Sequence, residues 1–160
     1  MTKRIVFIRH AKSDWSDWRL SDFDRSLNER GKSDLPVMAQ KWQTFGFAPD
    51  LIISSSAVRA RETASYFAHF FESTIRFEDN IYHSMPYIYL EHIHTLDQNI
   101  RTVVLVGHNP GISYLANIVA PNLNVEMPTC GMLFVTSIAN NWGDVTFDDM
   151  RYETFLAPKI

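Results

Sequence analysis

The sequence contains a single cysteine, Cys130, in 160 residues. One cysteine cannot form an intramolecular disulfide, so the core must hold the fold together, and a reducing cytoplasm is the expected compartment. We interpret Cys130 as a small core residue beside a strand and not as a nucleophile.

Long apolar runs and a strong excess of one charge are also missing. No run approaches the roughly 20 apolar residues that a membrane-spanning helix needs, and the N-terminus enters the first apolar stretch without a separate signal segment. The formal net charge is -3, so the chain lacks the excess of positive charge that is typical of a nucleic-acid-binding protein. Neither a membrane nor a nucleic acid is therefore an expected partner.

The composition that remains is that of an ordinary globular protein. With 46% hydrophobic and 21% charged residues, the chain can build a substantial core. Its length corresponds to about one domain. We find no internal repeat, low-complexity tract or linker, so residues 1–160 are predicted to form a single domain.

Apolar runs alternate with segments of helical periodicity through the first two thirds of the chain. The runs predict strands and the amphipathic segments predict helices. The predicted strands are residues 5–9, 49–56, 74–78, 101–107, 131–138 and 144–148, and the predicted helices are residues 29–45, 57–71, 86–96 and 110–119. This order predicts an α/β fold, a three-layer α/β/α sandwich with a mostly parallel sheet and an antiparallel C-terminal hairpin or edge strand.

A long segment between the first strand and the first helix has no clear period. Residues 12–25 are rich in Asp and Ser, which predicts a loop, and loops of this length often form lids or binding loops. Trp15 and Trp18 could either pack over a site or anchor the loop to the core. Arg25 is expected to play a structural role, paired with Asp22 or Asp24, although it could also line the entrance to a site.

An Arg-His pair ends the first apolar run. Residues 5–8 are Ile-Val-Phe-Ile, and Arg9 and His10 follow directly. Open α/β sheets bind ligands at the carboxyl ends of their strands, so this pair is a candidate site. The alternative is a strand that ends in two solvated polar residues.

A second candidate lies where the strand at 49–56 meets the next helix. Residues 54–56 are all serine, and Arg59 falls in the first helical turn. The free N–H groups and positive dipole end of a helix attract an anion, and a planar guanidinium matches phosphate oxygens. The alternative is that the serines are only caps and that Arg59 is a surface residue.

A third candidate follows the strand at 101–107. His108 comes directly after Gly107, and Pro110 stands near the start of the next helix. The glycine spacing is not a Walker loop, because the Gly-Lys-Ser/Thr ending is missing. Since the carboxyl ends of parallel strands converge, the three stretches would bring two Arg and two His together. Such a set suits a dianion beside a nucleophile, and phosphate is the obvious dianion.

These stretches resemble the histidine phosphatase superfamily, which has the phosphoglycerate-mutase-like fold, and in particular its SixA-like phosphohistidine phosphatase branch. The motifs that carry the resemblance are Arg9-His10-Ala11-Lys12-Ser13, Asp22-Phe-Asp-Arg25-Ser-Leu27-Asn-Glu-Arg-Gly31, Ser54-Ser-x-x-x-Arg59-Ala-x-x-Thr63-Ala64 and Val106-Gly107-His108-Asn109-Pro110-Gly111. In order and spacing they cover nearly the whole chain.

The resemblance implies a covalent mechanism. His10 would attack phosphorus, while Arg9, Arg59 and His108 would hold the phosphoryl oxygens and stabilise the transition state. Water would then release phosphate from His10. Neither a metal nor another cofactor is expected, because the arginines supply the positive charge. The expected partner is a phosphorylated protein, with phosphohistidine as the leading substrate class.

Two alternative functions stay open at this stage. A small phosphorylated substrate would make the chain a phosphomonoesterase of the same superfamily. A module that binds phosphate or a phosphoprotein without turnover would need the arginines but would not need a nucleophile, so the presence of both His10 and His108 argues against it.

Some positions depart from the family pattern. Ala11 replaces the usual Gly, Ser26 replaces a Pro that is common in this branch, and Ser16 stands where mutase-like members often carry a phosphate-contacting Asn.

The carboxylate acid of the mutase and sugar-phosphatase members also has no obvious match. Glu78 and Asp79 follow the third strand, but their surroundings differ from the family pattern. An alkoxide leaving group needs a proton from an acid, whereas a protonated phosphoramidate nitrogen needs much less help. The missing acid therefore favours phosphohistidine or acidic phosphate esters, unless Tyr82 or His83 serves as the donor.

Overall fold

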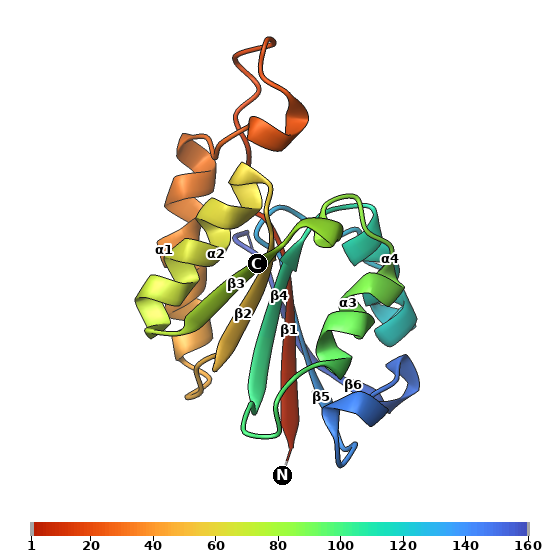
Figure 1. Cartoon of the computed structure of the whole chain (residues 1–160). Helices are drawn as coiled ribbons and strands as arrows, with labels where there is room; N and C mark the ends of the chain where they lie inside the picture. The colour runs from red at the N-terminus through yellow and green to blue at the C-terminus, as the bar shows by residue number, and fades with distance from the viewer. Residues whose placement is uncertain (1, 160) are drawn as a thin grey trace.

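A computed structural model of the chain describes residues 2–159. Its strands are β1 (Lys3–Arg9), β2 (Leu51–Ser55), β3 (Thr74–Glu78), β4 (Thr102–Gly107), β5 (Met132–Ser137) and β6 (Met150–Leu156). They form one sheet in the order β3-β2-β4-β1-β5-β6 (Figure 1). The first four strands are parallel to one another, and β5 runs antiparallel to both β1 and β6. The predicted mostly parallel sheet with an antiparallel C-terminal hairpin is confirmed.

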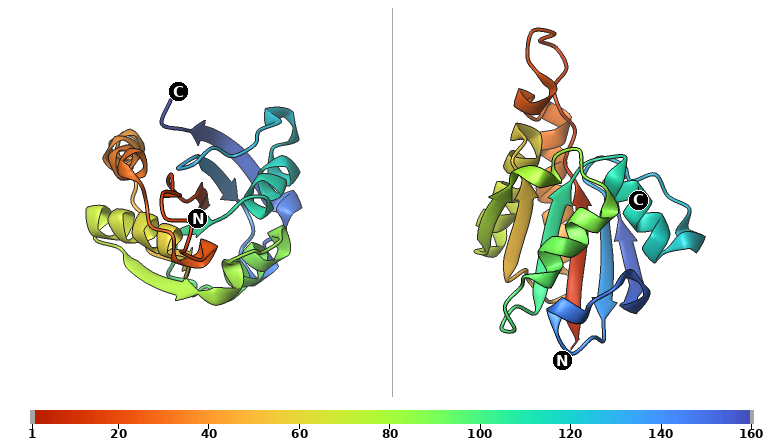
Figure 2. Two further views of the ribbon diagram at one scale, coloured as in Figure 1. Left: turned by 90° about the horizontal axis from the view of Figure 1, so that it is seen from above. Right: turned by 45° about the vertical axis from the view of Figure 1, so that its right-hand side comes forward.

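Helices cover both faces of the sheet and complete the three layers. Helices α1 (Glu29–Gln43) and α2 (Val58–Phe71) lie on one face, and α3 (Pro86–His94) and α4 (Gly111–Val119) lie on the other (Figure 2). Along β1, Ile5 and Phe7 face the cluster under α3 and α4, while Val6 and Ile8 face the cluster under α1 and α2. The apolar run that predicted this strand is continuous because both of its faces are buried.

The start of α1 matches its sequence signal. Asn28 is the N-cap, and its side chain accepts a hydrogen bond of 2.8 Å from the amide of Gly31. The helix ends at Gln43, two residues before the predicted end, and it continues through Pro36 without a break. Gly31 is required here, because a Cβ at this position would lie 2.2 Å from the carbonyl oxygen of Lys12.

The last predicted strand was wrong. Residues 144–148 do not form a strand; Trp142–Asp144 and Phe147–Asp149 form two 3-10 turns, and β6 begins at Met150. A capping box between Thr146 and Asp149 fixes the second turn. Trp142 is fully buried and donates from its indole nitrogen to the carbonyl oxygen of Ile100, which draws this segment onto the core. The connection from β5 to β6 is therefore longer than a tight hairpin turn.

Residues 12–24 form an arm that projects beyond the carboxyl ends of the strands, seen in red-orange at the top of Figure 1. Trp18 near its tip is 84% exposed and Trp15 is 58% exposed. Trp15 donates from its indole nitrogen to the buried Ser13 hydroxyl and packs on the buried guanidinium of Arg25, so it helps to anchor the base of the arm, whereas Trp18 contacts neither. The tip of the arm projects away from the strand ends in Figure 1, while its base, at Asp22, contacts Arg59 at the start of α2.

Arg25 holds the base of the arm. Its buried guanidinium donates to the carbonyl oxygens of Asp17, at 3.0 Å, and Leu20, at 3.1 Å, and it lies 4.0 Å from the ring centroid of Trp15. The predicted structural role is confirmed, but the partners are main-chain carbonyls and not the carboxylates of Asp22 or Asp24. These contacts fix the path of the arm between β1 and α1.

Candidate active site

His10 follows the last residue of the central strand β1. Its backbone amide donates to the carbonyl oxygen of Gly107, and the amide of Cys130 donates to the His10 carbonyl. The ring is 5% exposed, and its Nδ1 lies 2.7 Å from the carbonyl oxygen of Ala11. Because a carbonyl oxygen can only accept, Nδ1 carries the proton and Nε2 keeps its lone pair. The ring thus has the tautomer of a nitrogen nucleophile.

Arg59, in the first turn of α2, contacts the nitrogen that carries this lone pair. Its Nε donates to His10 Nε2 at 3.2 Å. Its Nη1 donates to the main-chain carbonyl oxygen of Asp22 at 2.6 Å, and its Nη2 donates to Asp22 Oδ2 at 2.9 Å. The guanidinium therefore joins the nucleophilic nitrogen to the base of the arm.

His108 lies opposite His10, with the two ring centroids 5.1 Å apart. Its Nε2 is 2.7 Å from Ser55 Oγ, and that oxygen also accepts a hydrogen bond from the amide of Ala57. The Ser55 hydroxyl hydrogen is then available to His108 Nε2, which favours the tautomer with its proton on Nδ1. The end of β2 in this way orients a side chain from the end of β4.

Two buried nitrogens in this cluster have no hydrogen-bond partner among residues 2–159. They are Nε of Arg9 and Nδ1 of His108. Arg9 is held in place by a 3.0 Å bond from its Nη1 to the carbonyl oxygen of Met127. Buried donors without partners cost free energy, and phosphoryl oxygens would satisfy them. All four residues that the sequence singled out thus lie together, and their unused donors suit an oxyanion.

Burial keeps both histidines neutral. The pKa of His10 is lowered to about 3, chiefly by burial and also by the positive charges of Arg59 and Arg9, while the hydrogen bond to the Ala11 carbonyl acts in the opposite direction. Burial likewise lowers the pKa of His108 to about 2, with His10 and Arg59 acting in the same direction. At neutral pH the His10 lone pair is therefore free of a proton.

The two histidines also predict how stability depends on pH. Their folded pKa values lie below the ordinary value of 6.5, so the unfolded chain binds protons that the folded chain does not. Their contribution is complete above about pH 6.5 and should be lost below it at about 1.4 kcal/mol per pH unit for each histidine. Urea unfolding at about pH 7 and about pH 5, where carboxylates remain ionised, would measure this loss. Equal stability at both values would contradict the prediction.

The structure adds Asp22 and Tyr82 to the predicted residues. The Tyr82 hydroxyl donates to Asp22 Oδ2 at 2.6 Å, and its ring lies 5.3 Å from that of His108. Burial raises the pKa of Asp22, but hydrogen bonds from Tyr82 and Arg59 outweigh it, so the pKa lies below its usual value. Burial and the Asp22 carboxylate both raise the pKa of Tyr82. Asp22 is therefore an ionised carboxylate, and Tyr82 keeps its proton.

Other candidates from the sequence have different partners. Glu78 pairs with Arg76 at 3.2 Å, and Asp79 accepts a hydrogen bond from Ser56 at 2.5 Å. His83 is exposed and its ring packs 3.9 Å from that of Tyr82. Ser16 lies exposed on the arm, where its amide donates to Asp14.

Sequence reasoning did not find the role of Asp22. It appeared only inside a motif and as a possible partner of Arg25. Asp22 reaches Arg59 because of the path that the arm takes, and the sequence pattern does not predict that path.

Within residues 2–159, no group of three or more His, Cys, Asp or Glu side chains is arranged to hold a metal ion. No helix there is long and apolar enough to cross a bilayer.

Known proteins resemble both the sequence and the fold. Residues 5–82 match the model of the histidine phosphatase superfamily (branch 1). The uncharacterized protein Rv1276c of Mycobacterium tuberculosis is 31% identical over 149 residues, which cover 86% of this chain and 91% of that protein. The putative phosphohistidine phosphatase SixA from Agrobacterium tumefaciens is 30% identical, with a TM-score of 0.82 and coverage of 98% of both chains.

A second solved structure supports the fold alone. The protein histidine phosphatase SixA complexed with tungstate has a TM-score of 0.81, covers 98% of this chain and 97% of its own, and is 16% identical. With the shared motifs and the 98% coverage of the A. tumefaciens protein, these matches agree on one assignment. The chain belongs to the histidine phosphatase superfamily, in its SixA-like branch.

Proposed function

We propose that this chain is a metal-independent phosphatase that forms a covalent phosphohistidine on His10, and that its substrate is phosphohistidine in proteins. The observation that carries the proposal is the unprotonated Nε2 of His10, which lies among the donors of Arg59, Arg9 and His108. The resemblance to SixA proteins, one of which was solved in complex with tungstate, supports the same function.

The first step transfers the phosphoryl group between two nitrogens. His10 Nε2 attacks phosphorus, the new N–P bond forms, and the N–P bond of the substrate breaks with its electron pair passing to the leaving imidazole. A phosphoryl oxygen would take over the Arg59 Nε–H that now points at His10 Nε2. Arg9 Nε and His108 Nδ1 would donate to the remaining oxygens and stabilise their charge in the transition state.

The second step returns His10 to its starting state. Water attacks phosphorus, and His10 leaves with the N–P electron pair on Nε2. Its Nδ1 proton stays on the hydrogen bond to Ala11, so the departing ring is neutral. The water protons leave with phosphate or pass to solvent. The arginines keep their protons throughout.

The phosphohistidine substrate is supported by two features of the site. Glu78 and Asp79 pair with Arg76 and Ser56, and the Tyr82 hydroxyl donates to Asp22. Asp22, the carboxylate that contacts Arg59, is ionised and offers no proton for an alkoxide. The tip of the arm projects outward from the strand ends in Figure 1 and does not fold back over them, as expected for a site that receives a side chain carried by another protein.

The test compares two substrates in the presence of a metal chelator. Phosphate release should be measured from a protein that carries phosphohistidine and from p-nitrophenyl phosphate. We expect release from both, a higher kcat/KM for the phosphoprotein, and an acid-labile phosphate on His10 in samples quenched during turnover.

Each alternative gives a different result. A dependence on divalent metal would contradict the mechanism. Faster hydrolysis of small phosphate esters would favour a phosphomonoesterase, and phosphate binding without release from either substrate would favour a binding module.

Ser55 should matter through His108. Ser55→Ala removes the oxygen beside His108 Nε2, so the ring loses the contact that favours its tautomer. We expect kcat/KM to fall about tenfold, the effect of one unsatisfied buried polar group. Ser54→Ala is a matched control, since this buried neighbour donates only to the main-chain carbonyl of Ser55. Equal losses in the two variants would count against an orienting role.

A further inference from the structure

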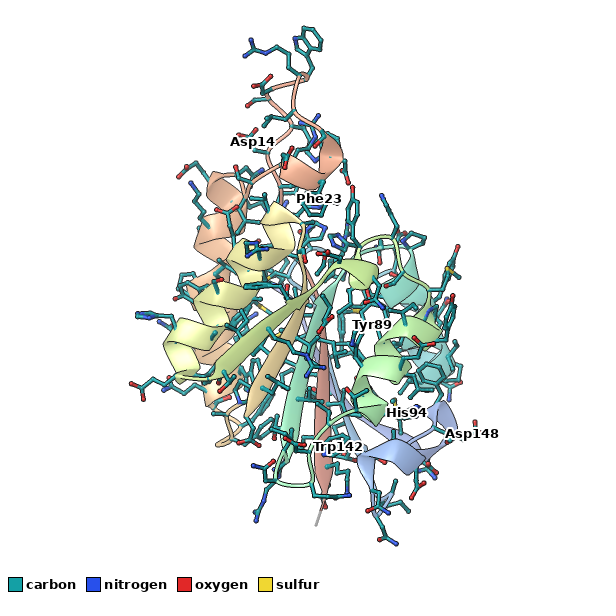
Figure 3. The ribbon with its side chains drawn as sticks, in the orientation of Figure 1. Asp14, Phe23, Tyr89, His94, Trp142 and Asp148 are labelled. Atoms are coloured by element: carbon teal, nitrogen blue, oxygen red, sulfur yellow. The ribbon has the colours of Figure 1, made fainter. Side chains whose placement is uncertain are left out.

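Asp22 and the rings beside it form a second part of the site, at its mouth. Phe23 and Tyr82 meet edge to face with centroids 5.0 Å apart, and the His83 ring centroid lies 3.9 Å from that of Tyr82. Figure 3 shows Phe23 between the arm and the carboxyl ends of the strands. The Asp22 side chain is 38% exposed beside these rings. This cluster lies next to the phosphoryl donors because Arg59 contacts both Asp22 and His10.

Oδ1 of Asp22 is the carboxylate oxygen that could bind a ligand. Arg59 and Tyr82 both donate to Oδ2, and among residues 2–159 no donor contacts Oδ1. An ionised carboxylate with one open oxygen, set beside aromatic rings, suits a planar cation that carries an N–H group. The groups that face this carboxylate are Arg59 from α2, Tyr82 after β3 and His108 after β4.

We infer that Asp22 is a specificity-determining residue that binds the leaving group as an imidazolium, through a hydrogen bond from the imidazole N–H remote from phosphorus to Asp22 Oδ1. This inference rests on the proposed function and names the form of substrate that the site prefers. Phe23 and Tyr82 would together form an aromatic surface beside the ring. The carboxylate then selects N-phosphoryl imidazolium over neutral phosphate esters.

The chemical reason lies in the protonation of the leaving group. Protonated N-phosphorylimidazole loses its phosphoryl group to give neutral imidazole, and no further proton is needed. A carboxylate beside the remote nitrogen favours that protonated form, as an opposite charge raises the pKa of a base. Asp22 would in this way replace the missing general acid without transferring a proton itself. It would also disfavour dianionic substrates that bring no positive charge.

The test uses N-phosphorylimidazole and p-nitrophenyl phosphate with the full-length protein. Both leaving groups are planar, so their comparison isolates charge and the N–H group. Asp22→Asn should lower kcat/KM for N-phosphorylimidazole by about 10- to 100-fold, the range expected for a lost charged hydrogen bond. The same variant should raise kcat/KM for p-nitrophenyl phosphate, because a negative charge beside the phosphate site is removed.

Asp24→Asn is the matched control. It removes the same charge from the same 3-10 turn, but Asp24 is exposed and contacts Ser21 instead of Arg59. The ratio of the two kcat/KM values should not change in this variant. Asp22→Ser provides a second neutral residue if the Asn variant folds poorly, as judged by thermal unfolding.

The outcomes separate this inference from the proposed function. A parallel loss on both substrates, or an unchanged ratio, in Asp22→Asn would reduce Asp22 to a support for Arg59 and overturn the inference alone. If the parent protein hydrolyses p-nitrophenyl phosphate but not N-phosphorylimidazole, both the phosphohistidine substrate and the inference fail.

Discussion

Replacing His10 with alanine should lower kcat/KM for both phosphohistidine protein and p-nitrophenyl phosphate by about 10⁴-fold or more, as expected when a covalent nucleophile is lost. The reason is geometric. His10 Nε2 is the unprotonated nitrogen that faces the donors of the pocket, and the neighbouring His108 has its Nε2 on Ser55. The measurement is steady-state phosphate release combined with a search for the covalent intermediate, which should be absent from the variant.

His69→Ala is the control for this experiment. His69 is an exposed residue on α2, so its loss should leave kcat/KM unchanged. Release that persists in His10→Ala at a rate near that of the parent would show that phosphorus is attacked by another group, such as water.

Replacing Arg59 with lysine should lower kcat/KM by about 10³-fold, even though the charge is kept, as for other guanidiniums that stabilise phosphoryl transfer. Arg59 uses three separate nitrogens, which contact His10 Nε2, the Asp22 carbonyl and Asp22 Oδ2. A single ammonium cannot reproduce this planar set. Both kcat and KM should be measured, because a group that acts mainly in the transition state should affect kcat more.

Arg61→Lys is the matched control on the same helix. Arg61 is exposed and its guanidinium lies 4.1 Å from the ring centroid of Phe77, outside the site. We expect less than a twofold change there. A comparably small change in Arg59→Lys would mean that positive charge alone is sufficient at residue 59.

The strands that carry the site could be predicted because their burial is visible in the sequence. β1, β2 and β4 are covered on both faces, so each appears as an unbroken apolar run with a defined end. Arg9, His10, Arg59 and His108 follow those ends, and the convergence of parallel strands brings them together. The edge strand β6 lacks such a run, since Arg151 and Glu153 are among its exposed residues, and the strand predicted at residues 144–148 does not overlap it.

Contacts that depend on the course of a loop could not be predicted in this way. Nothing in residues 12–24 indicates that the chain projects outward and returns with Asp22 against Arg59. That path depends on the bonds from Arg25 to main-chain carbonyls, which any residue could provide. The hydrogen bond between Ser55 and His108 could not be predicted either. It joins the ends of β2 and β4, which are neighbours in the sheet but far apart in the sequence.

The hydrogen bonds from Arg59 to Asp22 also affect how each catalytic cycle ends. Free phosphate has the same oxygens as the transferred group, so a pocket that binds the phosphoryl group well also retains the product. In the free protein, however, the Asp22 carboxylate and carbonyl already satisfy two Arg59 nitrogens. Phosphate can therefore bind Arg59 through Nε alone, while Asp22 holds the other two nitrogens. Product inhibition by phosphate should be weaker than the number of cations suggests, so that turnover need not be limited by product release.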